Sequence, residues 1–126
     1  MTARVLVVDD DEASALTLTS AIELLGDQVA LCLDGKCALE IAHETRPDVV
    51  LLDIGMPGLD GLKVCKILRQ DPSLAGMKII AQTGWGDQAM RDQTALAGFD
   101  MHLVKPVNFE QLADMFALFR AGLRQN

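Results

Sequence analysis

Short apolar runs alternate along the chain with segments whose apolar residues recur at helical spacing. The runs have the length of β-strands and span about residues 4–8, 28–33, 49–53, 77–82 and 100–104. The helical segments span about residues 13–25, 36–44, 87–97 and 109–123, with one more between Gly61 and Asp71. Because strand and helix alternate five times, the pattern predicts an α/β fold with a parallel sheet covered by helices on both faces.

The helical spacing also predicts which side chains face the core. In the segment 13–25, the predicted core side carries Leu16, Ile22 and Leu25 with intervening alanines. In the last helix the predicted core stripe is Leu112, Phe116 and Phe119, and Met115 and Leu118 widen it. The wider stripe has two interpretations, namely singly exposed apolar residues or a surface for a partner or a second copy of the chain.

The run Val49–Asp53 is apolar until its last residue, which is a carboxylate. Such a run is typical of a parallel strand buried on both faces. Glycine and proline residues follow Asp53 closely, so the chain must turn before the next helix begins. Asp60, directly before Gly61, is the better candidate for the cap of that helix. We therefore interpret Asp53 as a functional residue at the carboxyl edge of the sheet.

Other chemically active side chains follow the remaining strands. Asp9 and Asp10 come directly after the first strand, Thr83 follows the fourth and Lys105 follows the fifth. The next acid, Asp11, is accounted for by the first turn of a helix, where negative charge is favoured. Because the carboxyl ends of parallel strands meet at one edge of a sheet, we expect these groups to gather around the central carboxylate.

Three carboxylates placed together repel one another unless a cation compensates them. Mg2+ suits such a site, with Asp10, Asp53 and a backbone carbonyl near Gly55 as ligands. The Lys105 ammonium and the Thr83 hydroxyl are donors of the kind that a transferred phosphoryl group needs around its oxygens. An aspartate can itself be the nucleophile in such a transfer. The cluster therefore predicts phosphoryl chemistry that depends on Mg2+.

The composition limits the classes of protein that fit. The 126 residues, with a formal net charge of -7 and a pI near 4.6, suit one soluble domain over residues 1–126 and argue against direct binding to nucleic acid. No stretch is long and apolar enough to span a bilayer, so we expect a cytoplasmic protein without membrane insertion. Cys32, Cys37 and Cys65 make no C-x-x-C pair, and we expect buried reduced thiols.

Four motifs occur in order along the chain. They are Val8-Asp9-Asp10, Leu52-Asp53-Ile54-Gly55-Met56-Pro57-Gly58-Leu59-Asp60-Gly61, Gln82-Thr83-Gly84 and Leu103-Val104-Lys105-Pro106. Together, and over essentially the whole chain, they resemble the receiver domain of two-component response regulators. The variant Thr83-Gly84-Trp85-Gly86 is similar to receivers attached to hybrid sensor kinases, which raises the possibility of a domain cut from a larger protein. The resemblance implies a flavodoxin-like (CheY-like), doubly wound sheet of five parallel strands in the order 2-1-3-4-5, with five helices.

The resemblance also implies a phosphoaccepting switch in a phosphorelay. Asp53 would accept a phosphoryl group from a histidine kinase or a histidine phosphotransfer protein. The Mg2+ ligands would be Asp10, Asp53 and the carbonyl of Gly55, with Asp9 assisting through water. The groups in contact with the phosphoryl group would be Thr83 and Lys105, and a cis bond would join Lys105 to Pro106. Such a domain catalyses its own phosphorylation and dephosphorylation and turns over no external substrate.

The chain departs from the common receiver pattern at several positions. His102 stands three residues before the lysine, where many receivers carry an aromatic switch residue. It is either a partly exposed imidazole on a strand or a switch residue that moves inward as Thr83 moves toward the phosphoryl group. Gly55 has no side chain to orient a water, and Trp85 is large enough to shade the site. We expect dephosphorylation that is not fast.

Two rival functions are weighed against the phosphoaccepting receiver. The first is a receiver-fold scaffold that acts without phosphorylation, which would not need the complete set of acids, hydroxyl and lysine. The second is an aspartyl-phosphate phosphatase, which commonly carries a second acid two residues after the nucleophile, where this chain has Gly55. In receivers the signal often leaves through the fourth helix, fifth strand and fifth helix, here 87–97, 100–104 and 109–123, where a partner or a homodimer would form.

Overall fold

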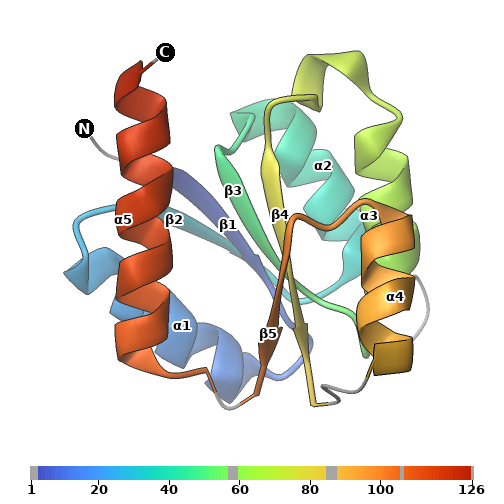
Figure 1. Ribbon diagram of the computed structural model, residues 1–126, viewed down its shortest axis with the longest axis horizontal. Helices are drawn as coiled ribbons and strands as arrows, with labels where there is room; N and C mark the ends of the chain where they lie inside the picture. Colours follow the sequence, from blue (N-terminus) through green and yellow to red (C-terminus); the bar gives the residue numbers. More distant parts are fainter. Residues whose placement is uncertain (1–2, 57–59, 85–87, 106, 126) are drawn as a thin grey trace.

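Five parallel strands form the centre of the molecule in the order β2-β1-β3-β4-β5 (Figure 1). The computed structural model describes residues 3–56, 60–84, 88–105 and 107–125. The strands are β1 (Arg4–Val8), β2 (Gln28–Cys32), β3 (Val49–Asp53), β4 (Lys78–Thr83) and β5 (Met101–Val104). The helices are α1 (Glu12–Leu24), α2 (Gly35–Thr45), α3 (Gly61–Arg69), α4 (Gln88–Ala97) and α5 (Phe109–Gln125), and a short 3-10 turn, η1 (Pro72–Leu74), precedes β4. The predicted fold class and strand order are confirmed.

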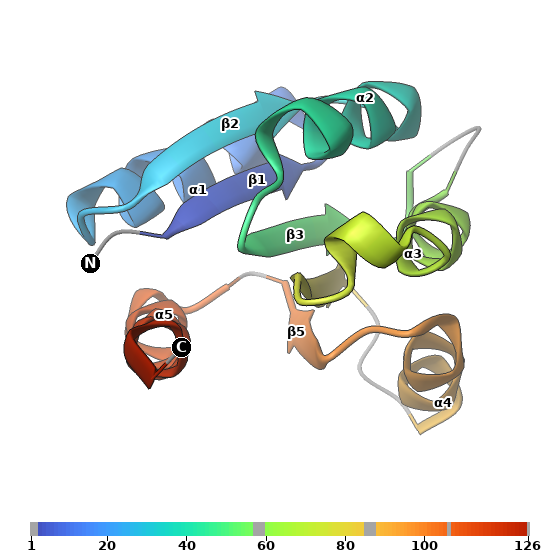
Figure 2. The ribbon, with the colours of Figure 1, turned by 90° about the horizontal axis from the view of Figure 1, so that it is seen from above.

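The helices form a layer on each face of the sheet. Helices α1 and α5 lie on one face, and α2, α3 and α4 lie on the other (Figure 2). Ile22 and Phe116 lie in the core between the sheet and the first layer, whereas Val64 and Leu68 lie in the core on the opposite face. Both faces of the central strand Val49–Asp53 are therefore buried, as its continuous apolar run predicts. Among the described helices, none has the length and apolar character to cross a membrane.

Side-chain caps fix where two of the helices begin. The Asp34 carboxylate accepts a hydrogen bond from the backbone N–H of Cys37 (2.7 Å) at the start of α2. Asp60 does the same for Lys63 (3.0 Å) at the start of α3, which confirms its predicted role. Since Asp60 caps α3, the carboxylate of Asp53 is not needed for that purpose.

The predicted core face of α1 is partly wrong. Leu16 is 50% exposed, whereas Ala15 and Leu18 are buried together with Ile22. Helix α1 carries small and hydroxyl-bearing residues between its leucines, so its apolar positions fit more than one helical phase. In α5, Met115 belongs to the core, whereas Leu118 is 70% exposed. Only one of the two residues that widen the α5 stripe is therefore left at the surface.

The prediction of three reduced thiols is also wrong. Cys32, at the end of β2, and Cys37, in the first turn of α2, form a disulfide. Cys65 is a free buried thiol, and burial raises its pKa to about 11. The C-x-x-C rule does not detect the pair because its members lie five positions apart. The turn between a strand and a capped helix brings them together, with a Cα–Cα distance of 5.7 Å.

An ion pair anchors α5 to the turn between α1 and β2. The Arg120 guanidinium pairs with both carboxylate oxygens of Asp27, and its Nε lies 3.1 Å from Oδ1. The Asp27 side chain is buried and also accepts a hydrogen bond from the backbone N–H of Ala3 (3.0 Å). The ion pair therefore ties α5 to a buried carboxylate that also binds the backbone of Ala3, directly before β1.

We expect Arg120→Ala to lower the free energy of unfolding by about 2 kcal/mol, because it leaves the buried Asp27 carboxylate without its charged partner. Urea denaturation measures the loss. Lys66→Ala is the control, since Lys66 is an exposed position on α3 and its removal should change the same free energy by less than about 0.5 kcal/mol. Equal, small effects of the two substitutions would contradict the anchoring role of Arg120.

Candidate functional site

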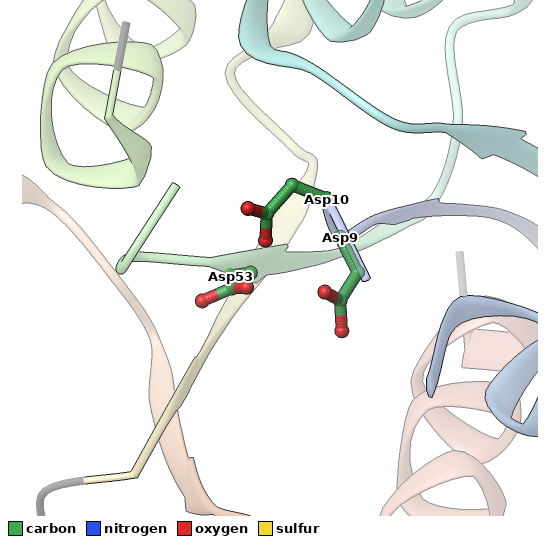
Figure 3. Close-up of side chains that lie close together, drawn as sticks. All are labelled: Asp9, Asp10 and Asp53. Atoms are coloured by element: carbon green, nitrogen blue, oxygen red, sulfur yellow. The ribbon is translucent and has the colours of Figure 1, made fainter. Parts of the chain in front are cut away.

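Three carboxylates meet where β1 and β3 end. Asp9 and Asp10 follow β1, and Asp53 is the last residue of β3. Each offers an oxygen that lies within 4.8 Å of those of the other two (Figure 3). Asp9 and Asp53 are buried, whereas Asp10 is exposed. The cluster is thus open to solvent on one side and is able to hold a metal ion.

The sheet itself places the two buried acids. Strands β1 and β3 are parallel neighbours, with Val8 opposite Leu52, so Asp9 and Asp53 lie side by side at the same edge. The backbone N–H of Asp9 continues the sheet by donating to the carbonyl of Cys32 on β2 (3.1 Å). The backbone of this acid therefore has a fixed place relative to three strands.

Backbone hydrogen bonds also orient the two buried carboxylates. The N–H of Asp11 donates to Oδ1 of Asp9, and the N–H of Gly55 donates to Oδ1 of Asp53, both at 2.9 Å. In each case the donor lies two residues further along the chain, in the loop that leaves the strand. The Oδ2 atoms of the two side chains remain for interactions across the site.

Lys105 bridges the two Oδ2 atoms. Its Nζ lies 3.1 Å from Oδ2 of Asp9 and 3.2 Å from Oδ2 of Asp53. Burial opposes the charge of the ammonium, but the hydrogen bonds and charges of the two carboxylates outweigh it and raise the pKa of Lys105. Lys105 is therefore charged at neutral pH, and the structure brings it to the predicted place.

Burial raises the pKa of Asp9, because the charged form loses its hydration. The Asp11 N–H and the Lys105 ammonium act in the opposite direction but do not cancel the effect. One ammonium also cannot neutralise three carboxylates. The site therefore carries an excess of negative charge, which a divalent cation would neutralise.

In metal-free buffer at pH 7, we expect Asp9→Asn to raise the free energy of unfolding. The raised pKa means that ionised Asp9 is less favourable in the folded protein than in the unfolded chain, and the amide removes that cost. The gain should be complete above the folded pKa of Asp9 and should shrink as the pH falls toward the ordinary value of 3.8. Urea denaturation over a pH series tests this, and a gain independent of pH would contradict it.

Thr83 lies at the same edge of the sheet. It is the buried last residue of β4, and its carbonyl accepts a hydrogen bond from the N–H of Lys105 (2.8 Å). The carbonyl before it, that of Gln82, accepts from the N–H of Ile54 (3.1 Å). Asp53, Thr83 and Lys105 thus end neighbouring strands or directly follow them, which places all three as the sequence predicts.

His102 lies on β5, away from the acid cluster along the strand, and is half-buried. Its Nδ1 is 3.4 Å from the hydroxyl of Thr94 on α4. Its Nε2 is buried and makes no hydrogen bond to the part of the chain that the structure describes. The imidazole therefore packs between β5 and α4, and its role as a switch residue stays a prediction.

Gln82 is a residue of this site that the sequence interpretation did not single out. Its side chain is fully buried, and neither atom of its amide has a hydrogen-bond partner within residues 3–56, 60–84, 88–105 and 107–125. It lines a cavity of about 460 Å³ together with Lys105 and with Ser14 and Thr17 of α1. The sequence signal that could have identified Gln82 is a polar residue within an otherwise apolar, buried strand.

Two predictions concern Trp85 and Pro106, which lie outside the described residues. The shading of the site by Trp85 and the cis bond before Pro106 therefore stay predictions. Gly55 is described and exposed, and its N–H holds the Asp53 carboxylate as stated above.

Comparison with known families fits this geometry. Residues 5–117 match the family described as "Response regulator receiver domain". The chain belongs to this family. Receiver domains are signalling switches rather than turnover enzymes, and the acidic pocket of Asp9, Asp10 and Asp53 is typical of their phosphoacceptor site.

Relatives of the receiver include longer response regulators. It is 37% identical, over all 126 of its residues, to the DNA-binding response regulator MtrA of Mycobacterium tuberculosis, and it covers 53% of that protein. It is 36% identical over 108 residues to the response regulator PleD of Caulobacter vibrioides, which is 86% of this chain and 24% of that protein. The chain thus spans about half the length, or less, of these relatives.

A solved receiver domain of a histidine kinase has the same fold. The signal receiver domain of a signal transduction histidine kinase from Syntrophus aciditrophicus aligns with a TM-score of 0.90 at 26% identity, over 99% of this chain and 95% of that one. This confirms the CheY-like fold and the likeness to receivers of sensor kinases.

Proposed function

We propose that this receiver accepts a phosphoryl group on Asp53 from a phosphohistidine of a histidine kinase or a histidine phosphotransfer protein. The observation that carries the proposal is the Asp53 carboxylate, which lies within 4.8 Å of two other acids and is bound by the Lys105 ammonium. Phosphoryl transfer to an aspartate uses a carboxylate nucleophile and cations that stabilise charge on the phosphoryl oxygens. Here Asp53 would be the nucleophile, Lys105 is one cation, and the other acids can hold a divalent ion.

Asp53 is held ready to act as the nucleophile. The Gly55 N–H fixes Oδ1, and Lys105 contacts Oδ2, so the carboxylate has one orientation before a donor arrives. An oxygen of Asp53 attacks the phosphorus, the phosphorus–nitrogen bond of the phosphohistidine breaks, and an acyl phosphate forms on Asp53. Positioning of this kind accounts for a large part of catalysis in phosphoryl transfer.

Lys105 and Thr83 serve the product of this reaction. Once Asp53 carries the phosphoryl group, its negative charge lies on the phosphoryl oxygens. The Lys105 ammonium, which is already 3.2 Å from Asp53, can then donate to them. The Thr83 hydroxyl is proposed as a second donor, since Thr83 ends the neighbouring strand. These contacts would couple phosphorylation to the loops after β4 and β5.

The acid cluster suits Mg2+, because its donors are hard oxygens and its negative charge exceeds what Lys105 neutralises. The proposed ligands are Asp10, Asp53 and the carbonyl of Gly55, with Asp9 acting through water. Bound Mg2+ would neutralise charge that develops on the phosphoryl oxygens. The exposure of Asp10 leaves the solvent side of the cluster accessible to the ion and to the donor.

The proposed output surface comprises α4, β5 and α5. Large apolar side chains are exposed on each of these elements: Leu96 on α4, Met101 and Val104 on β5, and Leu118 on α5. Exposed apolar groups of this kind support contact with a protein partner or with a second copy of the chain. Sedimentation velocity with and without beryllofluoride, a phosphoryl analogue, distinguishes a homodimer from a surface that another protein uses.

The direct test is the mass of the intact protein after incubation with acetyl phosphate, a small phosphoryl donor. We expect one added phosphoryl group in the presence of Mg2+ and none when the metal is chelated. The absence of an adduct in both samples, together with no change in the fluorescence of Trp85, the single tryptophan, on addition of beryllofluoride, would contradict the proposal. It would instead favour a receiver-fold scaffold that acts without phosphorylation.

A further inference from the structure

A pair of cysteines lies beside the acid cluster, and the phosphoacceptor function does not use it. Cys32 ends β2, and its side chain is 1% exposed. Cys37, in the first turn of α2, is half-buried. Their Cα atoms are 5.7 Å apart, within the range of about 4.4–6.8 Å that disulfides require. The backbone therefore needs no large movement for the two sulfurs to join.

We propose that Cys32 and Cys37 form a reversible thiol–disulfide site, for which a small-molecule disulfide of the glutathione class is the oxidant. A purely structural role fits the observations less well. The bond closes a loop between residues only five positions apart, and a disulfide restricts the unfolded chain less when its loop is short. The sheet also has a core on each face, so the fold does not depend on a covalent link as many small secreted domains do.

The different burial of the two sulfurs sets the order of the reaction. A glutathione molecule can reach the half-buried Cys37 but not the buried Cys32. The Cys37 thiolate attacks one sulfur of oxidised glutathione, the glutathione disulfide breaks, and one glutathione thiolate leaves. The Cys32 thiolate then attacks the Cys37 sulfur of the mixed disulfide, and the second glutathione leaves. The two cysteines lose two protons and two electrons, and oxidised glutathione gains them and becomes two molecules of glutathione thiol.

The environment of Cys37 suits the first of these steps. It lies in the first turn of α2, where the helix dipole favours negative charge, and Lys36 precedes it in the chain. The Asp34 carboxylate accepts a hydrogen bond from the backbone N–H of Cys37 and so holds this turn in place beside the end of β2. The position of Cys37 relative to Cys32 is therefore set by secondary structure and not by a mobile loop.

Cys65 provides an internal comparison. Its side chain is fully buried between α3 and α4, and Sγ donates to the carbonyl of Ala97 (3.3 Å). Burial raises the pKa of this thiol to about 11, so almost none of it is thiolate at neutral pH. Cys65 should therefore remain reduced under conditions that oxidise the pair.

The test is to incubate the reduced, folded chain with oxidised glutathione, to unfold it in the presence of N-ethylmaleimide and to count the labels by mass. We expect one label after oxidation and three after treatment with excess reduced glutathione. In Cys65→Ala, the oxidised sample should carry no label, and the sample treated with reduced glutathione should carry two. Three labels after oxidation, or failure of reduced glutathione to restore them, would overturn the proposal.

Two single variants test the order of attack. Cys32→Ala keeps an apolar side chain in the core and leaves Cys37 without its partner, so we expect it to retain one glutathione on Cys37. Cys37→Ser leaves only the buried Cys32 and Cys65, so we expect no glutathione adduct. Circular dichroism confirms that each variant is folded. An adduct on Cys37→Ser but not on Cys32→Ala would refute Cys37 as the attacking thiol.

Discussion

Asp53→Asn is expected to reduce phosphoryl uptake from acetyl phosphate to below detection. The side-chain amide is not a nucleophile toward phosphorus, whereas its oxygen can still accept the hydrogen bond from the Gly55 N–H that Oδ1 of Asp53 accepts. The variant should therefore fold and bind no phosphoryl group. Intact mass after incubation with acetyl phosphate and Mg2+ measures the phosphoryl uptake, and a thermal unfolding curve shows whether the variant is folded.

The matched control for this prediction is Asp60→Asn. Asp60 follows Asp53 in the chain before α3, but its carboxylate caps that helix through the N–H of Lys63. Asparagine is an equally good N-cap, so the structure should be retained and phosphoryl uptake should be normal. An adduct that persists in Asp53→Asn and maps to Asp9 or Asp10 would show that the phosphoacceptor has been assigned to the wrong acid of the cluster.

Gly61→Ala is expected to lower the free energy of unfolding by about 2–3 kcal/mol. A Cβ at this position would lie 2.4 Å from the backbone oxygen of Asp53 and 2.7 Å from the Cα of Ile54. Both neighbours belong to the backbone, so the clash cannot be relieved by a side-chain rotation. The end of β3 would have to move away from α3, and the phosphoacceptor would move with it.

The same substitution should therefore also slow phosphoryl uptake, by about 100-fold if Asp53 moves by about 1 Å. Urea denaturation and the initial rate of phosphorylation measure the two effects. Gly122→Ala is the control, because a Cβ added there would meet no neighbouring atom within 4 Å and alanine is the better helix former in α5. It should raise the free energy of unfolding by about 0.5–1 kcal/mol. Gly61→Ala with stability and uptake close to the original protein would disprove the close packing at Asp53.

The sequence was sufficient for the sheet and for the edge at which the site lies. The bounds of β3 were predicted as Val49–Asp53 because a strand buried on both faces is apolar at each position before its end. The parallel order then determined that Asp9, Thr83 and Lys105 lie at the same edge as Asp53. These predictions needed only the period of the hydrophobic pattern and the rule for strand ends.

Other features depend on contacts that no local pattern contains. The phase of α1 was ambiguous because Leu16 is apolar, as Ala15 and Leu18 are, but lies on a different side of the helix from these two buried residues. The disulfide depends on how the end of β2 meets the first turn of α2, and spacing alone does not fix that distance. Likewise, the position of His102 beside Thr94 depends on how α4 packs on β5. Local propensity does not specify such tertiary distances.

The hydrogen bonds from Asp9 to Cys32, from Ile54 to Gln82 and from Lys105 to Thr83 continue the sheet by one residue beyond the strands. The backbone that carries Asp9 and Lys105 therefore has little conformational entropy left to lose when a phosphoryl group arrives. That entropy is lost when the chain folds, and it need not be lost again in each cycle of phosphorylation. The site is preorganised by the same hydrogen bonds that complete the sheet, so fraying of this edge would weaken folding and phosphoryl transfer together.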